Sequence, residues 1–416
     1  MKHEHVHVVA AGEALDEPEQ ARRHAFTRGT VETAGDDKPD AHAASSISRG
    51  GTVKQIGWWL VVIAWLVPYL AAAQEKTLDI YFIDVEGGQS TLVVTPAGET
   101  LLIDTGFPST GTFASVPGDP AKARDANRIL AAAKAAGVKQ IDYLLLTHFH
   151  ADHDGAVPEL AQLIPIRTFV DHDAPGPQAE ERVPGTAAAF EAYARVRAKG
   201  AHLAPKPGDR IPLKGVETVV VSAAGATLKK PLDGGDAPNP ACSASAPAAQ
   251  EPSENPRSTG IRLKYGRFTF LDVGDLTGEP LFALACPVNM IGPTDLYLVA
   301  HHGGLDAADP ATFAAFAPRV AILNNGKAKG GSAEVLAALH QSRGLEDAWQ
   351  LHRSLPPGPR FFNDDRVANL DESTAFWLKM SARQDGSFTV TNARTGETKA
   401  YGVRSGATRP APRAVK

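Results

Sequence analysis

The chain has 416 residues, of which 43% are hydrophobic and 21% are charged, and its formal net charge is −5. This composition allows a sizeable core and excludes a chain that is disordered throughout. The net charge gives no electrostatic footprint for nucleic acid. A nucleic-acid partner would therefore depend on a local patch or on bound metal ions, and no basic patch is visible in the sequence.

The N-terminal 73 residues do not have the pattern of a folded domain. Residues 1–53 are polar and lack periodicity, which predicts a disordered or mistranslated extension. In residues 54–73, Lys54 precedes an uncharged, largely apolar run that ends in Ala71-Ala72-Ala73, as in a secretory signal peptide. We therefore expect a periplasmic or secreted protein. The alternative is an uncleaved membrane anchor formed by residues 56–73, and a membrane contact is expected only in that case.

The next part of the chain alternates strand and helix patterns. Short β-branched and aromatic runs predict strands, and an Ala-rich run that stops at Gly137 predicts a helix. The expected elements are strands at 78–83, 91–94 and 100–103, a helix at 123–136, a strand at 141–147, a helix at 155–163 and a strand at 166–170.

Residues 171–257 are expected to form a loop-rich insertion with one helix at 186–199, one strand at 216–222 and a surface loop over 223–256. Regular structure then resumes. The expected elements are a hairpin of strands 260–265 and 267–273, strands 295–300 and 319–323, helices 310–316 and 332–340, and a closing hairpin within 386–416. Strands followed by βα alternation in both halves predict an α/β fold, with two sheets flanked by helices in one domain over residues 77–385.

Histidines and carboxylates gather where the strand at 141–147 ends. His148 and His150 are spaced to turn toward one metal ion, and Asp152 with His153 can face a second one as the chain enters a helix. Zinc is bound by imidazole nitrogen and carboxylate oxygen that converge from a compact scaffold. The alternative, solvated surface histidines, does not explain their place after a buried strand, where sites assemble in α/β folds.

The segment from His148 to His153 resembles the H-x-H-x-D-H motif of the metallo-β-lactamase superfamily. Further stretches at 102–106, 270–275 and 300–304 resemble that superfamily's other motifs, in the same order. The resemblance implies an αββα sandwich and two divalent metal ions, zinc or alternatively manganese. It also implies that Asp275 bridges the two ions.

Within the superfamily, the hydrolase domain of ComEC-type DNA-uptake proteins is the nearest resemblance, through residues 84–90, 255–258 and the His-His-Gly at 301–303. The chain departs from that group at Glu86, Gln89 and Gly304. The further histidine that many superfamily members place before the bridging aspartate is absent, and the region holds Asn255 and Ser258 instead.

Other side chains are expected near the metals. His172 follows the strand at 166–170 and either reaches the site or makes a loop hydrogen bond. Asp84 and Asp104 stand at strand-to-glycine turns, where carboxylates can orient ligating imidazoles. Strand alternation predicts that only one of the adjacent histidines is a ligand, and we expect His301 as the ligand and His302 as a catalytic donor to the substrate.

These residues predict an exported, metal-dependent hydrolase that uses a metal-activated water, with Asp152 both as ligand and as the catalytic group that moves a proton. The expected substrate is a phosphoester. The alternatives are a small-molecule lactone, lactam or thioester and, from another class, a metal-binding protein that holds a ligand without turnover. Cys242 and Cys286 are too few for a disulfide framework, so Cys286 is expected as a buried thiol, with a Cys242–Cys286 disulfide as the alternative.

Overall fold

The computed structural model describes residues 76–108, 123–249, 252–355 and 362–404, all within one compact unit. The expected N-terminal extension, the signal peptide or anchor, and the C-terminal tail from residue 405 lie outside the described residues. No helix in these ranges is both long and apolar enough to cross a membrane.

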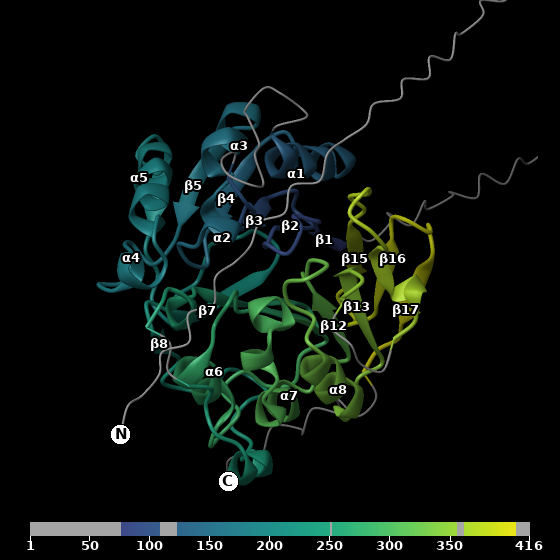
Figure 1. The fold of residues 1–416 in the computed structure, drawn as a ribbon. Coiled ribbons are helices and arrows are strands. Elements are labelled where there is room, and N and C mark those ends of the chain that lie inside the picture. The colour runs from purple at the N-terminus through teal and green to yellow at the C-terminus, as the bar shows by residue number, and fades with distance from the viewer. Residues whose placement is uncertain (1–75, 109–122, 250–251, 356–361, 405–416) are drawn as a thin grey trace, which may run out of the picture. The chain divides into compact units, whose positions relative to one another are not determined.

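The first of two sheets is a mixed sheet of nine strands, which joins the N-terminal strands of the described fold to the C-terminal strands β15, β16 and β17 (Figure 1). It is antiparallel from β17 to β3 and parallel from β3 to β6. In spatial order its strands are β17 (Thr398–Tyr401), β16 (Phe388–Asn392), β15 (Leu378–Ala382), β1 (Leu78–Phe82), β2 (Thr91–Val94), β3 (Thr100–Ile103), β4 (Ile141–Leu145), β5 (Ile166–Val170) and β6 (Ala201–Leu203).

A second mixed sheet has eight strands in the described residues. It is parallel from β14 to β10 and antiparallel from there to β8. Its order is β14 (Val367–Asn369), β13 (Asp347–His352), β12 (Val320–Leu323), β11 (Leu296–Leu298), β10 (Phe268–Asp272), β9 (Gly260–Tyr265), β7 (Glu217–Ala223) and β8 (Ala226–Thr227).

Helices cover the outer face of each sheet, and the sheets pack on one another. Between the sheets, the rings of Phe82 and Phe270 meet edge to face with centroids 5.9 Å apart. The first sheet is covered by α1 (Arg124–Ala135), α3 (Val157–Leu163) and α5 (Thr186–Arg197), and the second by α6 (Gly278–Ala285), α7 (Pro310–Phe316) and α8 (Ala333–Gln341) (Figure 1). The expected αββα sandwich is therefore present, because each sheet buries both of its faces.

The segment expected as a loop-rich insertion contributes to the core. Strand β7 pairs with β9 in the second sheet, and its residues Val220 and Val221 are fully buried. The following loop, expected on the surface, is held against α6 and α7, because Asn239 Nδ2 donates to the carbonyls of Ala285 and Ala311. The same loop carries Cys242.

Cys242 forms a disulfide with Cys286, which follows α6. The expectation of a buried thiol at Cys286 is therefore wrong, and the alternative pairing is present. The sequence left both possibilities open because two cysteines 44 positions apart have no distinctive spacing.

The expected boundary at residue 385 falls inside a continuous sheet. Strands β15 and β16 lie on either side of it and pair antiparallel from Leu378↔Asn392 to Ala382↔Phe388. Strand β15 in turn pairs with β1, so the hairpin expected to close the chain is an edge of the first sheet. Strands β13, β14 and β15 are not among the elements that the sequence pattern predicts.

Candidate metal centre

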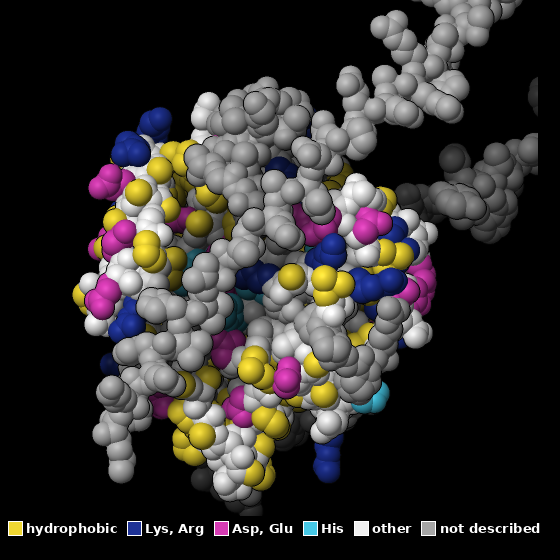
Figure 2. Space-filling model, viewed as in Figure 1, with side chains coloured by type: hydrophobic (Ala, Val, Ile, Leu, Met, Phe, Trp, Pro, Cys, Tyr) yellow, Lys and Arg dark blue, Asp and Glu magenta, His cyan; other side chains and the backbone are white. Residues whose placement is uncertain are grey.

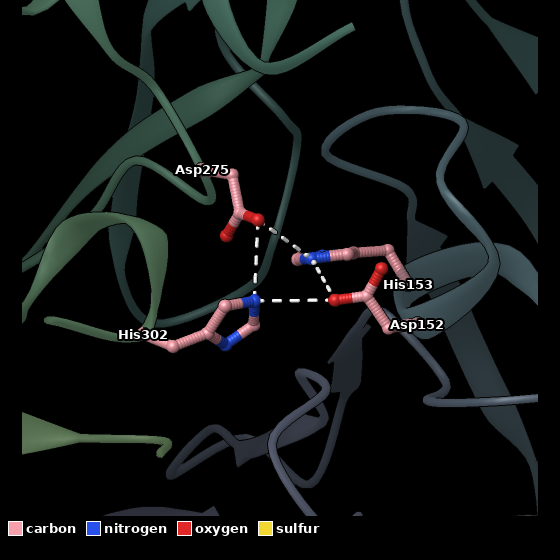
Figure 3. Close-up of side chains that lie close together, drawn as sticks. All are labelled: Asp152, His153, Asp275 and His302. Carbon is pink, nitrogen blue, oxygen red and sulfur yellow. Dashed lines mark hydrogen bonds and ion pairs between the residues drawn. The ribbon is translucent and has the colours of Figure 1, made fainter. Parts of the chain in front are cut away.

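Four side chains from three separate segments meet at the ends of the strands (Figure 3). Asp152 and His153 lie on the short helix α2 (Ala151–Asp154), which begins after β4, while Asp275 follows β10 and His302 follows β11. Each offers an atom within 4.8 Å of the others, and all are buried or nearly so. The carboxyl ends of β4, β10 and β11 therefore bring these ligand types together.

Asp275 has a central position in this group. Its Oδ2 lies 3.1 Å from His153 Nε2, 3.1 Å from His302 Nε2 and 3.9 Å from His148 Nε2. Gly274 permits this placement, because its φ is +56° and a Cβ there would lie 2.6 Å from the Cβ of Thr147. One carboxylate oxygen thus lies between two groups of imidazoles, as a bridging ligand would.

His148 and His150 form the second group of ring nitrogens. His148 Nε2 and His150 Nδ1 lie 3.0 Å apart. Burial, together with the neighbouring histidines, lowers the pKa of His148 well below its usual value. Burial also lowers the pKa of His150. Both rings are therefore neutral near pH 7, the form in which imidazole binds a metal.

The histidines and carboxylates of the cluster lie close together and shift one another's pKa values. Burial lowers the pKa of His153, but Asp275, Asp152 and Asp104 together raise it well above its usual value. Burial raises the pKa of Asp275, and His153, His302 and His301 outweigh this effect and lower it well below the usual range. The site therefore keeps its carboxylates ionised and attracts positive charge.

The donor set fits divalent metal ions. It comprises four imidazoles and two carboxylates, from His148, His150, His153, His302, Asp152 and Asp275. Among the described residues, the buried atoms Asp275 Oδ1 and His150 Nε2 have no hydrogen-bond partner. Buried polar atoms are seldom left without a partner, so these two atoms are consistent with metal ions bound beside them.

Asp104 lies where a carboxylate that orients an imidazole is expected. Its Oδ2 is 2.8 Å from His153 Nδ1, and its Oδ1 accepts from the backbone N–H of Thr147 at 2.8 Å. The bond to Nδ1 leaves His153 Nε2 facing Asp152 and Asp275. This is the carboxylate–histidine arrangement that commonly supports metal ligands.

The two adjacent histidines take the reverse of the expected places. His302 is buried within the cluster, whereas His301 is part-exposed, with Nε2 3.7 Å from Asp275 Oδ2 and Nδ1 2.8 Å from Asp306 Oδ2. The expectation assumed a strand through residue 300, but β11 ends at Leu298 and both histidines have positive φ, 48° and 54°. Strand alternation does not apply in such a turn, so the geometry favours His302 as the ligand.

The other expected residues lie at differing distances from the cluster. His172 is buried, with its Nε2 3.1 Å from Glu254 Oε2 and its ring against Phe149. Asn255 Nδ2 lies 3.5 Å from His301 Nε2, at the edge of the site. Ser258 is fully buried beside β7, where its carbonyl accepts from Ser222 Oγ.

Asp84 does not orient an imidazole of the cluster. Its carboxylate contacts His352 Nε2 at 2.6 Å and Arg128 at 3.0 Å, and Glu86 lies in the same group. His352 belongs to β13, a strand that the sequence pattern did not predict. The sequence suggests a role for Asp84 at the metal site because nothing in it reveals the contact with His352, which is 268 positions away.

Lys329 is the site residue that sequence reasoning missed. Its ammonium contacts Asp152 Oδ2, and this contact together with His153 lowers the pKa of Asp152 well below its usual range despite burial. The lysine lies in the turn between β12 and α8, 177 residues from Asp152. A lysine among glycines after a strand reads as an ordinary solvated turn, so nothing in the sequence marks it.

Part of the chain matches a known protein family. A model of the metallo-beta-lactamase superfamily matches residues 83–233, which include β2 to β7 and the cluster from His148 to His153. No curated protein sequence matches the chain. The match, together with the two mixed sheets flanked by helices, supports the metallo-beta-lactamase superfamily for this chain. The closer resemblance to ComEC-type DNA-uptake proteins stays a prediction.

Several solved structures are similar. A HARLDQ-motif mutant of the metallo-beta-lactamase from Cronobacter sakazakii is 16% identical, covering 53% of this chain and 75% of its own, with a TM-score of 0.31. The metallo-beta-lactamase fold protein YhfI from Bacillus subtilis is 11% identical, covering 66% and 96%, with a TM-score of 0.38. CmlA, a diiron beta-hydroxylase from Streptomyces venezuelae, is 13% identical, covering 60% and 44%, with a TM-score of 0.34.

Proposed function

We propose that this chain, which the family match and the fold associate with the metallo-beta-lactamase superfamily, is a metal-dependent hydrolase that acts on a phosphoester. The observation that carries the proposal is the position of Asp275 Oδ2 among His153, His302 and His148. A carboxylate so placed can serve two ions at once, with His148 and His150 on one side and Asp152, His153 and His302 on the other.

Divalent ions in such a pair supply Lewis-acid activation of water and of the substrate. The protein's own groups then have separate tasks. Asp152 orients the attacking water and takes up its proton, because its ionised carboxylate lies beside the cluster's imidazoles, 3.2 Å from both His153 Nε2 and His302 Nε2. His301 faces the cavity, with Asp306 bound at its Nδ1. Burial lowers the pKa of His301, but Asp275 and Asp306 raise it to about 9, so the protonated ring can donate from Nε2 to the leaving group.

The choice of a phosphoester depends on the small ligand set of the first metal position. Within the described residues, the region of Asn255 offers no third histidine beside His148 and His150, so an ion held there would have coordination positions left for substrate oxygens. A lactone, lactam or thioester remains the second candidate within hydrolysis. A ligand-holding protein without turnover is the candidate of another class, and measured turnover would exclude it.

The test is a substrate panel on the metal-loaded protein, comprising a phosphodiester, a phosphomonoester, a lactone and a β-lactam. We expect the phosphoesters to be hydrolysed, and Asp275→Asn to lose bound metal and activity together. If Asp275→Asn keeps two equivalents of metal, the bridging role is rejected. If only an acyl substrate turns over, hydrolysis stands and the phosphoester does not.

Export remains part of the proposal and is supported by two features. Residues 54–73 have the pattern of a signal peptide, and the Cys242–Cys286 disulfide suits an oxidising compartment. Mass spectrometry of the native protein should find the mature N-terminus at or near Gln74. A full-length chain confined to the membrane fraction would instead support the anchor.

A further inference from the structure

Lys329 brings a positive charge to the edge of the metal centre. Its ammonium contacts Asp152 Oδ2, the same oxygen that lies 3.2 Å from His153 Nε2 and 3.2 Å from His302 Nε2. The lysine side chain is 42% exposed, so one side of the ammonium faces solvent. A protonated lysine has three donors and no acceptor, so it cannot itself be a metal ligand.

The backbone fixes the position of this lysine. The carbonyl of Lys329 accepts from the N–H of Gly326, and the N–H of Gly331 donates to the carbonyl of His302, both at 2.9 Å. Gly330 has a φ of +72°, and a Cβ there would lie 2.2 Å from the His302 carbonyl oxygen. The turn therefore lies directly against the backbone of His302, which holds Lys329 beside the cluster.

A cavity of about 580 Å³ opens next to this ammonium. Its lining is formed by Ala248, His301, His302, Gly304, Leu305, Asp306, Lys329 and Gly330. Figure 2 shows histidine side chains in a hollow of this face, with lysine or arginine atoms close by. The carboxylate of Asp306 is engaged by His301 Nδ1 at 2.8 and 2.9 Å. Among the described residues that form this lining, Lys329 is the one lysine or arginine.

The lysine and a metal ion compete for the same carboxylate. When Asp152 Oδ2 is used as a ligand, a like charge stands beside the ammonium and the ion pair is weakened. An anion that enters the cavity then becomes the natural partner of Lys329. A phosphoester carries that anionic oxygen beside the bond to be cleaved, whereas the carbonyl of a lactone or lactam is neutral in the ground state.

We propose that Lys329 is the anion-binding residue of this site, which holds a non-bridging oxygen of a phosphoester and selects phosphoryl over neutral acyl substrates. This inference rests on the proposed function and names its substrate class. Lysine is a usual phosphate-binding residue because its ammonium is a compact charge. Removing a positioned donor to a developing anion typically costs about 10²–10³-fold in turnover.

The matched variants are Lys329→Met and Lys327→Met. Both remove an ammonium from the same turn at almost unchanged length, but Lys327 pairs with Glu372 at 3.0 Å and does not line the cavity. Lys329→Arg keeps the charge and controls for local structure. Metal content and thermal unfolding of each variant establish that it is folded and loaded.

The first measurement is binding of inorganic phosphate to the metal-loaded protein by calorimetry. We expect Lys329→Met to weaken phosphate binding at least about tenfold, Lys327→Met to leave it unchanged and Lys329→Arg to keep most of it. Equal phosphate affinity in wild type and Lys329→Met would overturn the proposal. A second readout is metal affinity, which should stay equal or rise in Lys329→Met because a competing cation is removed.

The second measurement compares kcat/KM for a phosphodiester and for a neutral aryl ester. We expect Lys329→Met to reduce the former by about 10²–10³-fold and to leave the latter within a few fold. An equal loss on both substrates would contradict selection by charge. If the wild type binds phosphate through Lys329 but hydrolyses no phosphoester, the proposed reaction fails and the anion site stands. If phosphoester turnover is intact in Lys329→Met, the reaction stands and the anion site fails.

Discussion

Asp104→Asn tests how the buried carboxylate prepares the metal centre. In the wild type, Asp104 Oδ2 lies 2.8 Å from His153 Nδ1 and accepts its N–H, which leaves Nε2 as the nitrogen whose lone pair a metal ion would take. An asparagine can still accept from the N–H of Thr147 through its carbonyl, but its NH₂ then faces His153. The ring must accept that hydrogen bond at Nδ1, which places its own proton on Nε2 and removes a metal-binding lone pair.

The expected size follows from this change of tautomer. Loss of a partner that orients a ligand typically lowers metal affinity by about 10–100-fold, which is roughly 1.4–2.7 kcal/mol. Asp104 is fully buried, its carboxylate contacts His153 and Thr147, and asparagine has nearly the same size, so the packing around it should persist. We therefore expect weaker metal binding in a protein that remains folded.

Asp84→Asn is the matched control. Asp84 also contacts an imidazole, His352 Nε2 at 2.6 Å, but Asp84, Glu86 and His352 form a second group of possible ligands outside the four-residue cluster. Both variants are loaded with zinc, dialysed against graded chelator and analysed for bound metal by mass spectrometry, with circular dichroism as the check on folding. The reasoning is refuted if Asp104→Asn retains metal as tightly as the wild type.

Three further predictions follow from the described contacts. His302→Ala should lose metal while His301→Ala keeps its metal stoichiometry, and elemental analysis showing the opposite would restore the assignment made from the sequence. Burial raises the pKa of Asp272 to about 7, so the folded chain keeps a proton there that the unfolded chain releases near pH 4. The protonated Asp272 therefore stabilises the folded chain less as the pH rises from 4 to 7. The free energy of unfolding of metal-free Asp272→Asn, measured in urea, should not show this decrease. Cys286→Ala should lower the free energy of unfolding by about 2–4 kcal/mol under non-reducing conditions, through loss of the bond to Cys242, and an unchanged denaturation midpoint would contradict it.

The sequence by itself determined the features that lie within one continuous segment. The run from His148 to His153 places its ligand types on a strand end and the helix that follows, so local spacing was enough to predict their convergence. The strand before Asp275 was equally clear, because β10 is a buried apolar run that ends in a glycine turn. Alternating strands and helices likewise indicated the two sheets and their helical layers.

Only the tertiary structure decided which distant side chains meet. Asp84 pairs with His352 across 268 positions, and Lys329 reaches Asp152 across 177. The roles of His301 and His302 depend on two left-handed backbone conformations after a strand that ends early, and no residue pattern specifies these. Local spacing determines which strand or helix end carries a side chain. The partner of that side chain depends on the register of the sheets and on the turns that the packed core imposes on the backbone.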